Sequence, residues 1–120
     1  MRQAIVLFAH GSRDPLWHRP MQAVSERIRT AHPDWAVECA YLELSQPDLP
    51  QTVADLVAQG IHAIRVVPLF LGVGKHVRED LPRMMRELAH LYPLVQFECD
   101  AAVGENKALL DLMAHIAARD

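Results

Sequence analysis

Two histidines are the residues of this chain whose type and surroundings point most directly to chemistry. His10 precedes Gly11, and His76 comes shortly after Gly72 and Gly74. Glycines beside a functional residue let the backbone turn sharply and approach a ligand closely. A single histidine at the end of a strand is usually only a polar loop residue. Two of them in similar contexts favour a shared site.

A carboxylate occurs in a comparable position. Glu43 follows the second apolar segment of the chain. Two imidazoles and a carboxylate suit a first-row divalent metal such as Fe, Co, Ni or Zn. A neutral histidine can equally accept a proton near pH 7. The residues alone therefore leave metal binding and acid–base chemistry open, and Glu43 is as readily interpreted as a solvated residue at a strand edge.

Cationic side chains lie close to both histidines. Arg13, Lys75 and Arg78 are each within three residues of His10 or His76. Together with the amino ends of the helices that follow, they predict a local anion-binding surface. Metal ligands beside a cationic surface suit a polyanionic molecule that takes up a metal.

The elements that must position these residues alternate along the chain. Apolar runs predict strands over residues 5–8, 37–42, 64–71 and 95–99. We expect helices from near Pro20, over residues 48–59, and in two later segments. The apolar residues that mark those later helices are Leu81, Met84, Met85, Leu88 and Tyr92, and then Leu109, Leu112, Met113 and Ile116. This alternation predicts an α/β fold with a parallel sheet covered by helices on both faces. Ligands of such sheets bind beyond the carboxyl ends of the strands, where both histidines are placed.

Composition narrows the function classes. The 120 residues fit one domain, 1–120, and the net charge of −3 argues against nucleic-acid binding. No apolar run reaches the length of a membrane span, and the apolar start lacks a cleavage site, so we expect a cytoplasmic protein without a membrane partner. The motif Gly72-Val73-Gly74 is too short for a dinucleotide fingerprint, and we expect no organic cofactor. Cys39 and Cys99 are expected to be small buried residues.

Three segments resemble the small CbiX-type sirohydrochlorin chelatases, which are class II chelatases. The first is Ala9–Pro15, with the sequence AHGSRDP, and the second is Pro68–Pro82, with the sequence PLFLGVGKHVREDLP. Leu42–Pro47 matches the glutamate loop between them. The second motif is long and specific, and the resemblance extends over nearly the whole chain.

The resemblance implies a fold and an activity. The fold would be the chelatase-like three-layer sandwich with a four-stranded parallel sheet in the order 2-1-3-4. The activity would be that of a lyase-type metal chelatase, which inserts cobalt or iron into sirohydrochlorin without ATP, for cobalamin or sirohaem biosynthesis. Nickel is a third candidate metal. A single copy of this unit would form a homodimer whose halves enclose the cleft.

The resemblance also implies roles for individual residues. His10 and His76 would bind the metal, and Glu43 would assist in metal binding or proton removal. The predicted substrate-binding residues are Ser12, Arg13, Gly72, Gly74 and Arg78.

Two other functions stay open. A non-catalytic carrier of metal or tetrapyrrole would use the same ligands. A histidine-phosphatase-like enzyme for phosphate transfer is disfavoured, since such enzymes normally place arginine directly before the histidine and this chain has Ala9 there.

Overall fold

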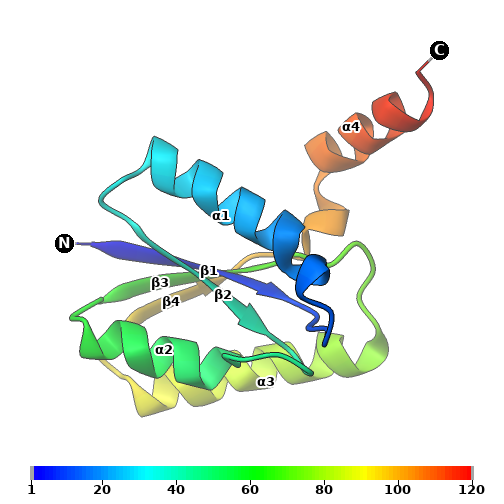
Figure 1. The fold of residues 1–120 in the computed structure, drawn as a ribbon. Helices are drawn as coiled ribbons and strands as arrows, with labels where there is room; N and C mark the ends of the chain where they lie inside the picture. Colours follow the sequence, from blue (N-terminus) through cyan, green and yellow to red (C-terminus); the bar gives the residue numbers. More distant parts are fainter. Residues whose placement is uncertain (1, 120) are drawn as a thin grey trace.

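Strands and helices alternate along the chain in the computed structural model, which describes residues 2–119 (Figure 1). In chain order the elements are β1 (Gln3–Ala9), the 3-10 turn η1 (Pro15–His18), α1 (Arg19–Ala31), β2 (Ala36–Tyr41), α2 (Leu49–Ala58), β3 (Ala63–Pro68), α3 (Lys75–Leu91), β4 (Gln96–Cys99), the 3-10 turn η2 (Val103–Glu105) and α4 (Lys107–Ala117). The predicted α/β alternation is confirmed.

The sheet has four parallel strands in the order β2-β1-β3-β4, as predicted. Ala9 pairs with Tyr41 of β2, and Phe8 pairs with Pro68 of β3. The carboxyl ends of β1, β2 and β3 are therefore level. This register brings the segments that follow these three strands together at one edge of the sheet.

Helices cover the two faces of the sheet unequally. On one face α2 and α3 pack against a core that includes Val6, Phe8 and Leu56. On the other face α1 lies over a smaller cluster that includes Ile5 and Leu7. β1 is buried from Ala4 to Ala9 because it is central in the sheet and covered on both sides.

Local sequence signals explain where the first two helices begin and end. Asp14 caps η1 by accepting a hydrogen bond from the Leu16 amide, and the main helix starts at Arg19, close to the predicted Pro20. Asp48 caps α2 in the same way. Gly60, with φ of 85°, follows α2 in the left-handed conformation that glycine adopts without strain.

Two boundaries were predicted wrongly. β3 ends at Pro68 rather than residue 71, because β1 ends at Ala9 and its last backbone hydrogen bond to this segment comes from the Leu69 amide to the Phe8 carbonyl, at 2.8 Å. α3 begins at Lys75, so His76 lies in the first helical turn and not in a loop. Pro82 is accommodated inside α3.

Cys99 and α4 also differ from expectation. Cys99 is exposed, since it lies near the end of the edge strand β4, whereas Cys39 is half-buried as a small residue beneath α1. α4 contains the four apolar residues that predicted it but projects away from the sheet (Figure 1). No helix between residues 2 and 119 has the length and hydropathy required to span a bilayer.

Candidate functional site

His10 follows β1 directly and is fixed by contacts from two other segments. Its Nδ1 lies 3.2 Å from Oε1 of Glu43. Its carbonyl oxygen accepts a 3.1 Å hydrogen bond from the indole Nε1 of Trp17, and its ring lies 4.6 Å from the ring of Phe70. A carboxylate can only accept hydrogen bonds, so Nδ1 of His10 must donate. In the neutral ring, Nε2 then keeps its lone pair for another partner.

Ser45 joins the segment after β2 to the segment after β1. Its Oγ donates a 2.7 Å hydrogen bond to the carbonyl of Ser12 and accepts a 3.0 Å bond from the Ser12 amide. Oγ also lies 3.0 Å from Nε2 of His18. The single hydroxyl hydrogen is already used, so His18 must donate at this contact. We call these three hydrogen bonds the Ser45 bridge.

The His18 ring packs against the ring of Tyr41. The two rings are stacked with their centroids 4.6 Å apart. Burial raises the pKa of the Tyr41 phenol, and the neighbouring Cys39 thiol adds to that shift. Tyr41 is therefore a neutral ring at physiological pH, and it holds His18 in place for the Ser45 bridge.

Gly11 makes the closest approach between the two segments. A Cβ at this position would lie 1.7 Å from the carbonyl oxygen of Glu43 and 2.9 Å from the amide nitrogen of Ser45. Glycine is therefore required here because Gly11 contacts the backbone of a neighbouring loop. The sequence analysis had instead predicted that this glycine allows a sharp turn or the close approach of a ligand.

His76 is held very differently. It lies exposed in the first turn of α3, and its side chain makes no hydrogen bond to any residue from 2 to 119. Gly74 precedes the helix without a side-chain cap. A Cβ on Gly72 or Gly74 would meet no atom within 4 Å, so the backbone before His76 borders open space.

One cavity contains both histidines. It has a volume of about 230 Å³, and its lining residues are His10, Phe70, Gly72, Val73, Gly74, Lys75, His76 and Val77. The structure thus brings together His10, His76 and the two predicted glycines. Glu43 reaches this cavity through its contact with His10.

A larger, mostly apolar groove of about 570 Å³ adjoins this cavity and shares Phe70, Val73 and Val77 with it. It runs between α3 and the carboxyl end of β4. Leu81 and Met85 line its apolar part, and its charged residues are Arg78, Arg86, Asp100 and Glu105. Of the predicted cationic residues, Arg78 therefore lies in the groove, next to the histidine cavity.

The remaining predicted residues lie on the other side of His10. Arg13 is exposed and follows Ser12. The Ser12 hydroxyl accepts a 3.1 Å hydrogen bond from the Asp14 amide, and the Ser12 backbone takes part in the Ser45 bridge. Ser12 is therefore already engaged in holding the loop together.

The described residues do not form a ready-made cage for a metal ion. Between residues 2 and 119, no three His, Cys, Asp or Glu side chains lie close enough together to hold one. Two imidazoles at one cavity give an open site with free coordination positions. Such a site suits an ion that is passed on more than one that is stored.

Trp17, His18, Ser45 and Phe70 were not identified from the sequence as parts of the site. Trp17 and Phe70 contact His10, Ser45 contacts Ser12, and His18 contacts Ser45, so these contacts join residues up to 60 positions apart in the chain. The Ser and Pro residues of Leu42–Pro47 predicted a loop but not the hydrogen bonds that Ser45 forms. The one available hint was that aromatic and polar residues cluster around Gly11.

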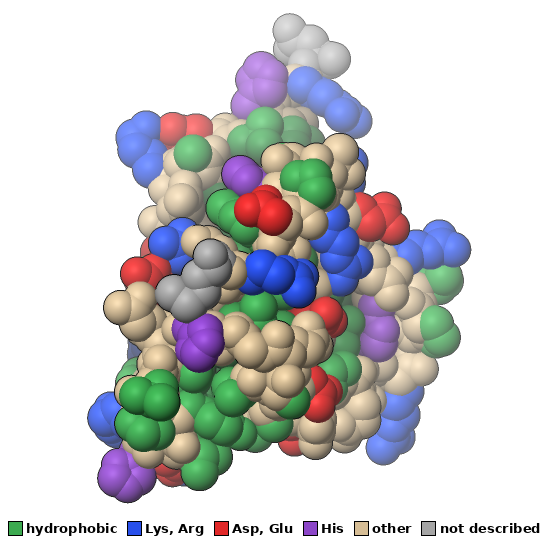
Figure 2. All heavy atoms as spheres, turned by 90° about the vertical axis from the view of Figure 1, so that its left-hand side faces the viewer, with side chains coloured by type: hydrophobic (Ala, Val, Ile, Leu, Met, Phe, Trp, Pro, Cys, Tyr) green, Lys and Arg blue, Asp and Glu red, His purple; other side chains and the backbone are tan. Residues whose placement is uncertain are grey.

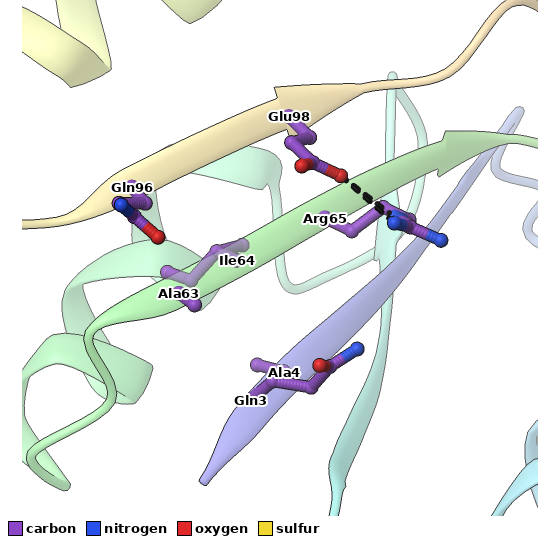
Figure 3. A pocket seen from close by; sticks show the side chains of 7 residues that line it. All are labelled: Gln3, Ala4, Ala63, Ile64, Arg65, Gln96 and Glu98. Atoms are coloured by element: carbon purple, nitrogen blue, oxygen red, sulfur yellow. Dashed lines mark hydrogen bonds and ion pairs between the residues drawn. The ribbon is translucent and has the colours of Figure 1, made fainter. Parts of the chain in front are cut away.

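At the opposite end of the sheet, residues 2–119 bring no comparable group of histidines and carboxylates together. A hollow of about 160 Å³ there contains Gln3, Gln96 and the ion pair of Arg65 with Glu98, whose side chains meet across β3 and β4 (Figure 3). Nε and Nη2 of Arg65 donate to the same oxygen of Glu98, at 3.1 and 2.9 Å. The surface around this end mixes acidic and basic side chains, without a patch of one sign (Figure 2).

The family model described as CbiX matches residues 4–119. The chain belongs to the CbiX family. Among curated relatives, the sirohydrochlorin cobaltochelatase of Methanococcus aeolicus is 35% identical over 83 residues, covering 69% of this chain and 58% of that protein. The sirohydrochlorin cobaltochelatase of Sulfolobus acidocaldarius is 26% identical, covering 91% and 85%. The chain thus spans less than two thirds of the length of the Methanococcus relative.

Solved structures of the family share this fold. A CbiX protein of Marinobacter aquaeolei, described as a putative cobalamin biosynthesis protein, superposes with a TM-score of 0.81 at 30% identity, covering 96% of this chain and 93% of that one. The sirohydrochlorin chelatase SirB of Bacillus subtilis, in complex with cobalt, gives a TM-score of 0.78 at 28% identity, with 96% of this chain matched to 49% of SirB. SirB has also been solved with Fe³⁺.

Proposed function

We propose that this CbiX-family protein is a sirohydrochlorin chelatase that inserts a divalent metal into a carboxylate-rich tetrapyrrole without ATP. The observation that carries the proposal is that His10 and His76 line one cavity, which opens into an apolar groove with arginines. Relatives named sirohydrochlorin cobaltochelatase, and SirB structures with cobalt and Fe³⁺, support cobalt or iron as the metal substrate. Nickel is a further candidate, since imidazole also suits it.

His10 and His76 are the proposed metal ligands. Glu43 fixes the His10 ring through Nδ1 and leaves Nε2 to bind the ion. A carboxylate behind a metal-binding histidine orients the ring and makes it a better ligand. Glu43 therefore acts first on His10, and its second oxygen can take up a proton during insertion.

The apolar groove is the proposed site of the macrocycle. Its apolar side chains Val77, Leu81 and Met85 suit the ring face, and Arg78 suits a carboxylate substituent. The unpaired amides in the first turn of α3 also favour an anion, and Gly72 and Gly74 leave room for its approach. Ser12 and Arg13 contact substituents on the opposite side of His10.

The reaction exchanges one metal ion for two protons. The ion leaves His10 and His76 for the four nitrogens of the ring, and two pyrrole N–H protons are released. The two freed imidazoles and the Glu43 carboxylate are the groups that would accept these two protons. Two protein ligands hold the ion more weakly than four ring nitrogens do, so transfer is downhill.

The proposed functional unit is a cytoplasmic homodimer. SirB is about twice as long as the segment that this chain matches, so one SirB chain has room for a second such unit. Two copies of this shorter chain would together match the length of one SirB chain and could enclose a cleft between them.

The decisive experiment is a spectroscopic insertion assay with sirohydrochlorin and Co²⁺, Fe²⁺ or Ni²⁺. We expect His10→Ala and His76→Ala each to lower the rate by at least about 100-fold, because each removes a direct ligand. His90→Ala, at the far end of α3, is the matched control and keeps the wild-type rate. Full insertion rates in both ligand variants would refute the assignment.

A non-catalytic carrier is the alternative favoured by the open two-histidine site. It would bind metal or sirohydrochlorin stoichiometrically. The same assay separates the two functions, because a carrier does not accelerate insertion above the spontaneous rate.

A further inference from the structure

Four large apolar side chains lie around His10 at the carboxyl edge of the sheet, and the rest of the described chain leaves them largely uncovered. They belong to three separate segments: Leu16 and Trp17 to η1, Leu44 to the loop after β2, and Leu71 to the loop after β3. Their exposed fractions are 58%, 51%, 59% and 62%, in that order. We call these four side chains the apolar rim. Exposed apolar residues that gather around one site, rather than occurring singly, indicate a binding surface.

The first segment of the apolar rim is fixed directly to His10. Trp17 donates a 3.1 Å hydrogen bond from its indole Nε1 to the His10 carbonyl oxygen. The turn that carries it is capped by Asp14, whose carboxylate accepts a 2.9 Å hydrogen bond from the Leu16 amide. The indole is therefore held beside a proposed metal ligand, although about half of its surface faces solvent.

Leu44, in the second segment, is held at a conformational cost. It follows Glu43, whose Oε1 lies 3.2 Å from Nδ1 of His10. Gly11 packs against the peptide groups on both sides of Leu44. A Cβ on that glycine would lie 1.7 Å from the Glu43 carbonyl oxygen and 2.9 Å from the Ser45 amide nitrogen. Leu44 has φ of 64°, a conformation that leucine adopts only with strain. A strained residue whose side chain is exposed adds little to the stability of the fold, so its conservation of that geometry points to a function.

Leu71 completes the apolar rim from the third segment. It follows Phe70, whose ring centroid lies 4.6 Å from that of His10. The Gly104 amide donates a 3.0 Å hydrogen bond to the Phe70 carbonyl, and a Cβ on Gly104 would lie 1.7 Å from the Leu71 carbonyl oxygen. All three segments thus present their apolar side chains from backbones that other contacts hold in place. A surface ordered in this way loses little conformational entropy when a ligand binds.

The apolar rim is continuous with the apolar groove between α3 and β4. Phe70 lines the groove and directly precedes Leu71. Arg13 adds an exposed cation in the segment that leads to η1, and Arg78 lies in the groove. The surface around His10 is therefore apolar in its middle and cationic towards its borders. A flat ring with carboxylates at its periphery has the complementary arrangement.

We infer that the apolar rim binds one face of the macrocycle, which reaches from the groove across His10 to Leu44 and Trp17. Four side chains are too few for a protein partner, because a stable protein interface takes about 20–30 residues on each side. The rim residues determine how tightly the ring is held, whereas His10 and His76 hold the ion. The inference rests on the proposed function and names a surface that recognises its substrate.

The first test measures the affinity for metal-free sirohydrochlorin by the fluorescence anisotropy of the tetrapyrrole. Leu44→Asn combined with Leu71→Asn should weaken binding by at least about 10-fold, because two exposed apolar side chains no longer cover the ring. Leu91→Asn combined with Leu94→Asn is the matched control. These leucines are 65% and 87% exposed at the far end of α3, roughly 20 Å along the helix from His76, and their replacement should leave the affinity unchanged.

The second test separates recognition of the ring from a structural role. Leu44→Asn alone should raise the resistance to urea, because asparagine relieves the backbone strain, and yet weaken sirohydrochlorin binding. A residue that only supported the fold would change stability and binding in the same direction. The affinity for Co²⁺ alone should stay within about 2-fold of the wild type, since the contact of Glu43 with His10 is kept.

The outcomes distinguish this inference from the proposed function. Wild-type affinity for sirohydrochlorin in the Leu44→Asn, Leu71→Asn variant, with insertion still dependent on His10 and His76, would overturn the inference alone. An equal loss in the Leu91→Asn, Leu94→Asn control, or a parallel loss of Co²⁺ affinity in Leu44→Asn, would also overturn it. A wild-type protein that binds no sirohydrochlorin would overturn both.

Discussion

His10 and His76 line the same cavity, but the chain holds them with different degrees of constraint. His10 is bound on three sides, by Glu43, Trp17 and Phe70. His76 lies on the first turn of α3 without a side-chain hydrogen bond to the described residues, and glycines border open space before it. One of the two proposed ligands is preorganised and the other can adapt. This difference suits a site that must first capture an ion and then release it to a macrocycle.

Among the stability changes, the largest should come from Gly11→Ala, which alters the constrained His10 side. The added methyl would overlap the Glu43 carbonyl, so we expect the free energy of unfolding to fall by about 3 kcal/mol. Gly72→Ala is the matched control on the His76 side, where the space is open and a change within about 0.5 kcal/mol is expected. Urea denaturation measures both. Equal losses would show that the two segments are constrained alike.

Glu43→Ala tests how His10 is oriented. Without its partner at Nδ1 the ring is free to turn, and we expect metal affinity to weaken by about 10- to 100-fold. Glu43→Gln can still accept from Nδ1 through its amide oxygen and should retain most of the affinity. Titration with Co²⁺, followed by absorption, measures both. An equal loss in the two variants would assign the role to the negative charge of Glu43.

Ser45→Ala should also destabilise the loops around His10, but by less than Gly11→Ala does. It leaves the Ser12 backbone groups and Nε2 of His18 without their partner, at a cost of about 1–2 kcal/mol in the free energy of unfolding. Ser25→Ala is the control, because the buried Ser25 hydroxyl has no hydrogen-bond partner within residues 2–119 and its removal should be neutral or stabilising. Similar losses in both variants would show that the Ser45 bridge adds nothing.

Leu44→Asn should give the smallest change, and in the opposite direction. Leu44 has φ of 64°, a conformation that asparagine tolerates better than leucine. We expect a gain of about 0.5–1 kcal/mol in the free energy of unfolding. Leu44→Ala removes the same exposed side chain but keeps the backbone strain, so it should show no gain. Thermal unfolding of the two variants would separate them.

The α/β class could be predicted because it depends on local patterns, and short motifs singled out the two histidines that line one cavity. The alternation of apolar runs and amphipathic helices was sufficient for the fold, and the resemblance supplied the strand order. The sequence analysis placed His76 in a loop because glycines precede it and the apolar periodicity starts only at Leu81, whereas the helix begins immediately after Gly74. Periodicity alone does not reveal that a proline will be tolerated inside a helix.

The constraint on His10 could not be predicted. Trp17, His18 and Ser45 act through contacts that exist only once the strand register has aligned the ends of β1 and β2. The apolar pattern of α4 correctly predicted an amphipathic helix. It gave no indication that the helix would project away from its own sheet. A periodic pattern indicates that one face of a helix is apolar, but it does not identify the element that covers this face.

The projection of α4 also bears on how this protein behaves at high concentration. Leu112 and Ile116 are 53% and 52% exposed to solvent. An exposed apolar surface of this kind favours non-specific association, and salts such as sulfate strengthen that association. Aggregation in ammonium sulfate should therefore begin at a lower salt concentration for the wild type than for a variant with Leu112→Glu and Ile116→Glu.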